Sequence, residues 1–209
     1  MTKHLLSGHA HFRAEYFAGE ADFLRNLASA GQKPSALYIG CSDSRVVPEL
    51  LTSSRPGELF VVRNIANVIP VLESADSSVG AAVDYAVEKL GVPHIIVCGH
   101  DGCGGVKAAI EGIDQLTSLA SLHEWLQGVV PAVATVRKLG LTGDELTRAA
   151  VEENVLTQMD NLISFPSVAR GLAAGTLALH GWVFDLAEGA LRVYDVDTQE
   201  FVTPQQLAS

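Results

Sequence analysis

The sequence is poor in the features on which extracellular and membrane proteins depend. It holds only three cysteines, an odd number too small for a disulfide framework, which favours a reducing compartment and thiolate or metal chemistry. No run reaches the roughly 18 apolar residues of a membrane span, and the first residues lack the apolar core of a signal peptide. We therefore expect a cytoplasmic protein without a membrane partner.

Basic residues are also scarce. The chain has 14 Lys and Arg residues against 24 Asp and Glu residues, a net charge of -10. Because phosphate backbones bind to basic surfaces, nucleic acid is not an expected partner. With 209 residues, 48% of them hydrophobic, the chain suits one ordered globular domain. We predict a single domain over residues 1–209, in which an N-terminal helical arm (1–31) precedes an α/β core (32–209).

Hydrophobic patterning alternates between strands and helices along the chain. This alternation predicts an α/β fold, a mainly parallel β-sheet flanked by helices, with one antiparallel edge strand near the C-terminal end. Strands are predicted at residues 35–40, 58–63 and 94–99, and two more around Glu188-Gly189. Helices are predicted at residues 9–30, 77–90, from 104 onward, at 118–139 with a bend or restart at Pro131, and at 143–163.

Two of the predicted strands end in reactive residues. One runs into "CSDSR" at residues 41–45, and another runs into "HDGC" at residues 100–103. Sites in open α/β sheets form beyond the carboxyl ends of the strands, so we expect the two segments to meet there. Cys41, His100 and Cys103 offer one nitrogen and two sulfur ligands. This is a ligand set of catalytic zinc, which leaves a fourth position open.

Several other interpretations of the cysteines stay open. A lone cysteine is more often a buried core residue, and Cys98, inside its strand, is interpreted in that way. The charged, glycine-rich flanks of Cys41 and Cys103 favour a site instead. A closed structural zinc site would take Asp43 as its fourth ligand. A redox pair lacks the C-x-x-C motif, and a phosphate-binding loop at "GHDGCGG" lacks the G-K-[ST] ending of a P-loop.

These motifs resemble those of the β-class carbonic anhydrases. The pattern C-x-D-x-R begins at Cys41, and H-x-x-C begins at His100, 59 positions later (100 minus 41). Between them, "PGELFVVRNIANVIP" at residues 56–70 is similar to the family's segment at that place. The resemblance implies a parallel α/β sheet, a homodimer or an assembly of dimers, and the reversible hydration of CO2 to bicarbonate and a proton.

The resemblance also assigns roles at the metal. It implies that Cys41, His100 and Cys103 bind one zinc ion per subunit. It further implies that Asp43 orients the nucleophile, and that Arg45 holds Asp43 away from the open metal position. This arrangement is chemically reasonable, because the planar donor fork of an arginine matches the two oxygens of a carboxylate.

A substrate pocket is implied in the same way. CO2 is small and apolar and needs an apolar wall, whereas bicarbonate needs a hydrogen-bond donor. The matching positions are Val46, Phe60 and Tyr85 for the wall and Gln32 for the donor, with Phe60 and Tyr85 supplied by the partner subunit. Gly104 adds a backbone amide at the start of a helix. Taken singly, the three apolar residues would be interpreted as ordinary packing residues.

Some members of the family that these motifs resemble are inhibited by bicarbonate at a second site, which contains a tryptophan, a tyrosine and an arginine. In this sequence Tyr38 and Phe184 stand at the first two places, and Arg63 is retained. Because the tryptophan and the phenol donor are missing, we predict an open, non-allosteric site in which Asp43 is paired with Arg45.

Two alternative functions share the motif. One is the hydrolysis of carbon disulfide or carbonyl sulfide, which differs in substrate access rather than in metal ligands. The other is a noncatalytic protein stabilised by zinc. The Asp43-Arg45 pair speaks against the second alternative, because a structural zinc ion does not require it.

Overall fold

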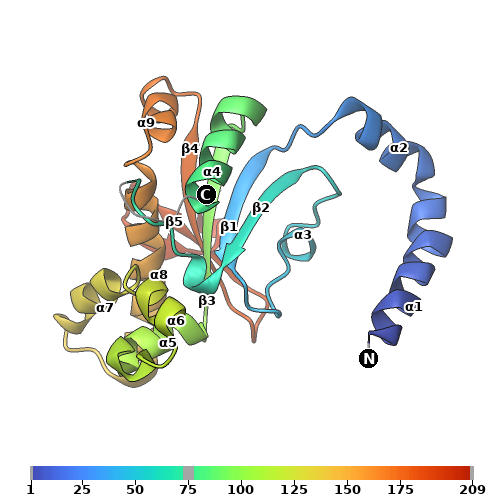
Figure 1. The fold of residues 1–209 in the computed structure, drawn as a ribbon. Helices are drawn as coiled ribbons and strands as arrows, with labels where there is room; N and C mark the ends of the chain where they lie inside the picture. The colour runs from blue at the N-terminus through green and yellow to red at the C-terminus, as the bar shows by residue number, and fades with distance from the viewer. Residues whose placement is uncertain (1, 73–77, 208–209) are drawn as a thin grey trace.

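The protein is built around a six-stranded β-sheet, and the computed structural model describes residues 2–72 and 78–207 (Figure 1). The strand order is β2-β1-β3-β4-β5-β6. Strands β1 to β4 are parallel, whereas the β4-β5 and β5-β6 pairs are antiparallel. The strands are β1 (Ala36–Cys41), β2 (Leu59–Asn64), β3 (His94–His100), β4 (Ala178–Phe184), β5 (Leu191–Asp195) and β6 (Glu200–Val202).

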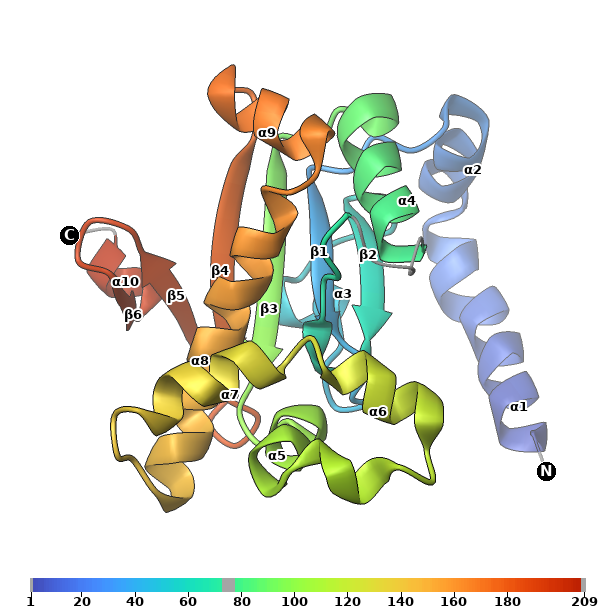
Figure 2. The same ribbon diagram turned by 60° about the vertical axis from the view of Figure 1, so that its left-hand side comes forward.

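Most helices cover one face of the sheet or its lower end, while α3 lies behind the sheet in Figure 2. Helix α8 crosses β3 and β4, and it comes so close that a Cβ added at Gly99 would lie 2.9 Å from the Val155 Cγ2 atom. The helices after the arm are α3 (Pro48–Leu51), α4 (Ser78–Asp84), α5 (Gly104–Glu111), α6 (Ala120–Leu126), α7 (Val130–Arg137), α8 (Gly143–Leu162), α9 (Pro166–Ala173) and α10 (Pro204–Leu207). Within the described residues, no helix combines the length and the apolar character needed to cross a membrane.

The core follows from the two-residue period of the strands. Leu37 and Ile39 on β1 point into the main core beneath the helices, whereas Tyr38 between them packs on the other face with Ile96 and Cys98. All five side chains are buried. The central strands are therefore apolar on both faces, which explains why their sequences are continuous apolar runs.

The predicted parallel sheet is confirmed, and the C-terminal segment differs in detail. The sequence predicts one antiparallel edge strand, but the structure has two. Asp195 ends β5, and its carboxylate accepts hydrogen bonds from the Asp197 amide and the Thr198 hydroxyl. This turn, with Gln199 at a φ of 59°, starts the three-residue strand β6.

The predicted helices are divided more finely in the structure. Helix α7 restarts with Pro131 in its first turn, as expected for proline. The predicted helix at 77–90 begins at a residue outside the described part of the chain, and from Ser78 it continues through α4 into a π-helical turn at Tyr85–Leu90. Helix α9 was not predicted, and it also begins with a proline.

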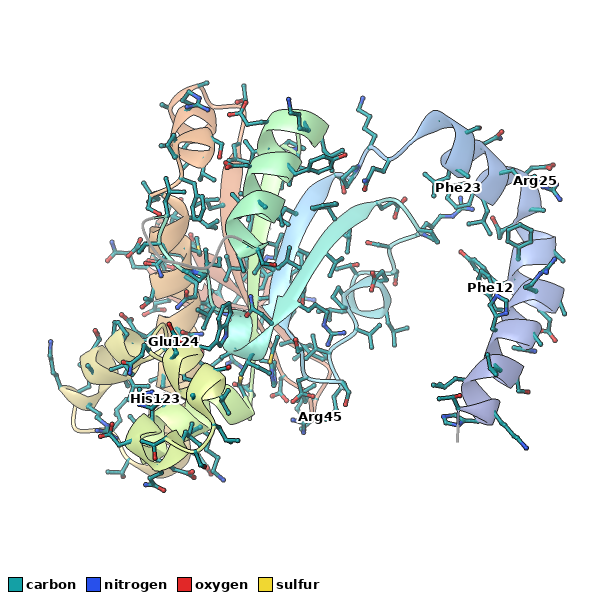
Figure 3. The ribbon with its side chains drawn as sticks, viewed as in Figure 1. Phe12, Phe23, Arg25, Arg45, His123 and Glu124 are labelled. Carbon is teal, nitrogen blue, oxygen red and sulfur yellow. The ribbon has the colours of Figure 1, made fainter. Side chains whose placement is uncertain are left out.

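The N-terminal arm extends away from the sheet in both views (Figures 1 and 2). It consists of α1 (Lys3–Phe12), a π-helical turn (Arg13–Phe17) and α2 (Ala21–Ala30), none of which has a buried residue. One contact with the core is made by Arg55, whose Cζ atom lies 3.7 Å from the ring centroid of Phe23 on α2. Figure 3 shows Phe12 and Phe23 on this arm.

Candidate metal centre

Three side chains that could bind a metal ion meet at the carboxyl end of the sheet. Cys41 is the last residue of β1, and His100 is the last residue of the neighbouring strand β3. Cys103 lies at the position that precedes α5. The Sγ atoms of Cys41 and Cys103 are 3.9 Å apart, and the three ligand atoms lie within 4.8 Å of one another. All three residues are buried, so the segments predicted to meet do meet.

Two glycines determine the conformation of the turn that leads from His100 into α5. Gly102 has a φ of 69°, a conformation that side chains other than glycine rarely adopt, and it turns the chain from β3 back toward Cys103. Gly105, in the first turn of α5, lies against the segment after β2. A Cβ at Gly105 would lie 2.9 Å from the Ala66 Cβ and 3.0 Å from the Ile65 Cγ2. The absence of a side chain therefore lets α5 approach this turn.

The imidazole of His100 presents one nitrogen to the two sulfurs. Its Nδ1 atom lies 3.0 Å from the carbonyl oxygen of Asp101. A carbonyl oxygen only accepts hydrogen bonds, so Nδ1 carries the proton and Nε2 carries the lone pair. Among the described residues, Nε2 is buried and has no hydrogen-bond partner. A cation bound between this nitrogen and the two sulfurs would give the buried, unpaired acceptor a partner.

The two sulfurs also suit a metal ion. The hydrogen bond with Cys103 lowers the pKa of the Cys41 thiol to about 4, and the neighbouring His100 ring acts in the same direction against the effect of burial. The contact with Cys41, together with burial, raises the pKa of Cys103. Tetrahedral zinc with bonds of about 2.3 Å to sulfur places two sulfurs about 3.8 Å apart, close to the observed separation. The residues present therefore fit zinc.

Beside these three residues, Asp43 and Arg45 form a bidentate salt bridge. Arg45 donates from Nε to Oδ1 of Asp43 at 2.9 Å, and from Nη2 to Oδ2 at 2.7 Å. The backbone amide of Arg45 also donates to Oδ1, at 3.0 Å. These hydrogen bonds hold the pKa of Asp43 well below its usual range. The Oδ2 atom lies 3.8 Å from Nε2 of His100, so an ionised carboxylate borders the ligand group. Figure 3 shows Arg45 in the loop at the lower end of the sheet.

Comparison with known proteins agrees with this geometry. A family model described as carbonic anhydrase matches residues 36–191, and the similar solved structures are β-carbonic anhydrases. The chain belongs to the β-class carbonic anhydrases. The carbonic anhydrase of Synechocystis sp. is 40% identical over 203 residues, which cover 96% of this chain and 74% of the relative. That of Pseudomonas aeruginosa is 40% identical over 206 residues, which cover 95% and 90%.

The fold comparison gives the same class. The structure of the β-carbonic anhydrase CcaA superposes with a TM-score of 0.93 at 40% identity, covering 97% of this chain and 92% of that chain. A tetrameric β-carbonic anhydrase from Sordaria macrospora gives a TM-score of 0.79 at 29% identity, covering 91% and 95%. The structure of this chain is thus that of a β-carbonic anhydrase along nearly its whole length.

The resemblance matched Arg63 to the arginine of the family's second bicarbonate site, and in this carbonic anhydrase its side chain contacts the backbone of the loop that follows β1. Arg63 donates from Nε to the carbonyl oxygen of Cys41 at 2.9 Å, and from Nη2 to that of Asp43 at 2.5 Å. It therefore fixes the backbone of Cys41 and of Asp43. The register could have indicated this role, because Arg63 pairs with Gly40, next to Cys41.

The predicted substrate residues fall into two groups in the structure of this carbonic anhydrase. Val46 is buried in the loop after β1, and Gly104 begins α5 directly after Cys103, so both lie in the segments that carry the metal ligands. Gln32 is exposed and precedes β1 at the opposite end of that strand from Cys41.

Phe60 and Tyr85 also lie away from the metal ligands of their own chain. Phe60 on β2 pairs with Leu37 on β1. Leu37 lies four residues before Cys41, so Phe60 is about 13 Å from the Cys41 end of the sheet, measured along the strands. Tyr85 packs on Phe60 with ring centroids 5.9 Å apart, and 48% of its surface is exposed. A single chain of this carbonic anhydrase therefore does not bring these two rings to its own metal centre.

A groove of the carbonic anhydrase includes Ser42, the residue that follows Cys41. It has a volume of about 440 Å³ and is lined by Ser42, Asn64, Ile65, Ser121, Leu122 and Trp125. Trp125 is fixed there by a hydrogen bond of 2.9 Å from Nε1 to the carbonyl oxygen of Ile65. Its lining is mainly apolar, which suits a small apolar substrate.

Proposed function

We propose that this β-carbonic anhydrase catalyses the reversible hydration of CO2 with one zinc ion per subunit, held by Cys41, His100 and Cys103. The observation that carries the proposal is the buried, unpaired Nε2 of His100, which faces two sulfurs beside the Asp43-Arg45 pair. A zinc ion that served only to stabilise the fold would not require that pair.

Each side chain has a role that follows from its contacts. Cys41, His100 and Cys103 would hold a zinc ion that lowers the pKa of water to about 7 and so would supply hydroxide at neutral pH. Asp43 is ionised and only accepts hydrogen bonds, so it orients the attacking hydroxyl group toward CO2. Arg45 engages both carboxylate oxygens and keeps Asp43 from turning toward the ligands.

We further propose that the site is open and is not regulated by bicarbonate at a second site. The Asp43-Arg45 pair is formed, which supports an available fourth metal position. Arg63 is engaged with backbone carbonyls, Tyr38 is fully buried, and Phe184 has no donor group. Phe184 therefore offers no donor to an anion, and two of the guanidinium nitrogens of Arg63 already donate to carbonyl oxygens.

The active site is proposed to be completed in a homodimer or an assembly of dimers. Gln32, Phe60 and Tyr85 lie far from the metal ligands of their own chain, so a partner chain would have to supply them. Val46 and the amide of Gly104 would complete the pocket from the first chain. The Sordaria macrospora relative is described as tetrameric, which is consistent with this proposal.

The test is zinc analysis followed by stopped-flow CO2 hydration from pH 6.5 to 9. We expect about one zinc ion per chain and a rate that rises smoothly with one ionisation. Activity only above pH 8 would contradict the open site, because it would mean that Asp43 occupies the metal at neutral pH. Zinc binding without turnover at any pH would favour the sulfur-substrate hydrolase or the noncatalytic alternative.

A further inference from the structure

A three-residue ion cluster lies next to the metal-ligand turn. Arg192 on β5 donates from Nη1 to Oδ2 of Asp101 at 2.9 Å, and from Nη2 to Oδ1 at 3.1 Å. Its Nε atom donates to Oε1 of Glu152 on α8 at 3.0 Å. The side chains of Arg192, Asp101 and Glu152 are 17%, 22% and 26% exposed. Because the cluster is partly shielded from water, its geometry is better defined than that of an exposed ion pair.

Asp101 connects this cluster to the imidazole of His100. Its carbonyl oxygen is the partner of Nδ1 of His100, and its amide donates to the carbonyl oxygen of Phe184 on β4 at 2.9 Å. The next residue, Gly102, turns the chain toward Cys103. Asp101 is thus fixed by its amide to β4 and by its carboxylate to β5, and its carbonyl sets the tautomer and orientation of the His100 ring.

Bracing of the fold alone does not account for the cluster. An ion pair that only joined β5 to α8 would need Glu152 and Arg192. The second carboxylate, on Asp101, adds a like charge to a partly buried place, and burial together with this charge raises the pKa of Glu152. The carboxylate of Asp101 instead connects the ion cluster to the residue whose carbonyl oxygen accepts the hydrogen bond from His100.

We propose that Arg192 is a positioning residue for the metal centre. By clamping the Asp101 carboxylate it fixes the Asp101 carbonyl, and this carbonyl aims Nε2 of His100 at the sulfurs of Cys41 and Cys103. Arg192 touches neither the ligand atoms nor the substrate, and it acts only through Asp101. The inference rests on the proposed zinc site.

The experiment measures zinc release to a chelator from the zinc-loaded, full-length protein. Arg192→Met removes the clamp and keeps an unbranched side chain, whereas Asp101→Asn keeps the shape of the side chain and removes its charge. We expect each variant to release zinc about tenfold faster than the wild type, the lower end of typical effects of residues behind metal ligands. Arg192→Lys should restore part of the loss, because it keeps the charge without the fork.

Two controls separate positioning from stability. Glu152→Gln removes the carboxylate that does not contact the metal-ligand turn, and Arg170→Met removes an ion pair with Glu88 on the helices α9 and η3 (Tyr85–Leu90). Both should release zinc at nearly the wild-type rate, with the thermal midpoint of each metal-free variant measured alongside. The absorption spectrum of the cobalt-substituted protein should change in Arg192→Met and not in Arg170→Met.

The outcomes distinguish the inference from the function on which it rests. If the wild type retains zinc and Arg192→Met and Asp101→Asn release it no faster than Arg170→Met, the positioning role is wrong and the zinc site stands. If the wild type retains no zinc, both proposals fail. If Arg192→Met does not fold, Asp101→Asn and Arg192→Lys decide the question by the same release rate.

Discussion

Arg45 engages both carboxylate oxygens of Asp43, which lies only two residues before it in the chain. The pair spans one turn of the loop after β1, and its Asp43 end lies 3.8 Å from the nearest nitrogen of His100. A guanidinium is therefore placed to control a carboxylate that is itself within reach of the metal position.

Removal of this guanidinium should separate metal binding from catalysis. We expect Arg45→Ala to retain zinc, because Arg45 contacts no ligand atom, and to lose about 100-fold or more in kcat/KM, because Asp43 is no longer held in place. Zinc analysis and stopped-flow hydration measure the two effects. Arg25→Ala, which removes an exposed ion pair with Asp22 on the arm, is the control and should keep full activity. Full activity in Arg45→Ala would contradict the role.

The three cysteines should differ sharply in their effect on zinc. We expect Cys41→Ser and Cys103→Ser to lose most of the bound zinc, because each removes a sulfur ligand. Cys98→Ala should keep it, since Cys98 faces the other side of the sheet and burial raises the pKa of its thiol to about 12. The measurement is zinc content after dialysis. Loss of zinc in Cys98→Ala with an unchanged fold would show that the ligands are misassigned.

His180 should make stability depend on pH. Burial, and then the neighbouring His94, lower the pKa of His180 from its ordinary value of 6.5. The folded protein therefore favours the neutral ring. The stabilisation that His180 gives the folded state is complete above pH 6.5 and is lost as the pH falls below that value. We expect the thermal midpoint to fall less between pH 7.5 and 5.5 in His180→Gln than in the wild type. His4→Gln, on the exposed arm, should behave as the wild type, and an equal fall in all three proteins would refute the prediction.

Mixed dimers can test whether the partner chain completes the active site. Cys41→Ser and Tyr85→Ala should each be nearly inactive alone, the first without zinc and the second without part of the pocket. When they are co-expressed, each mixed dimer would contain one intact site, formed by the metal ligands of one chain and Tyr85 of the other. We expect activity to return in the isolated mixed dimer. If both groups of residues belonged to one chain, mixing would restore nothing.

Much of the metal centre was predictable because it depends on local rules. Cys41 and His100 end apolar runs, and adjacent parallel strands end at the same edge of a sheet. The spacing between His100 and Cys103 is short enough for a single turn to close it. These features require no knowledge of distant contacts, so the grouping of the ligands followed from the sequence.

The supporting contacts were not predictable in this way. Asp101 and Arg192 are 91 residues apart, and their pairing depends on how β5 is placed beside β4. Strand β6 was missed because three residues are too short for a periodic signal and its position depends on the Asp195 turn. Tertiary placement, rather than local preference, determines these features.

The close contact between Gly105 and Ala66 makes two segments of the chain depend on each other when either is substituted. Only a hydrogen atom fits at position 105, because the methyl group of Ala66 and the side chain of Ile65 occupy the space around it. Any larger residue at position 105 would demand a compensating change in the Ile65–Asn67 turn, where Ala66 already has a φ of 59°. Sequence libraries for this enzyme should therefore vary position 105 and the Ile65–Asn67 turn jointly.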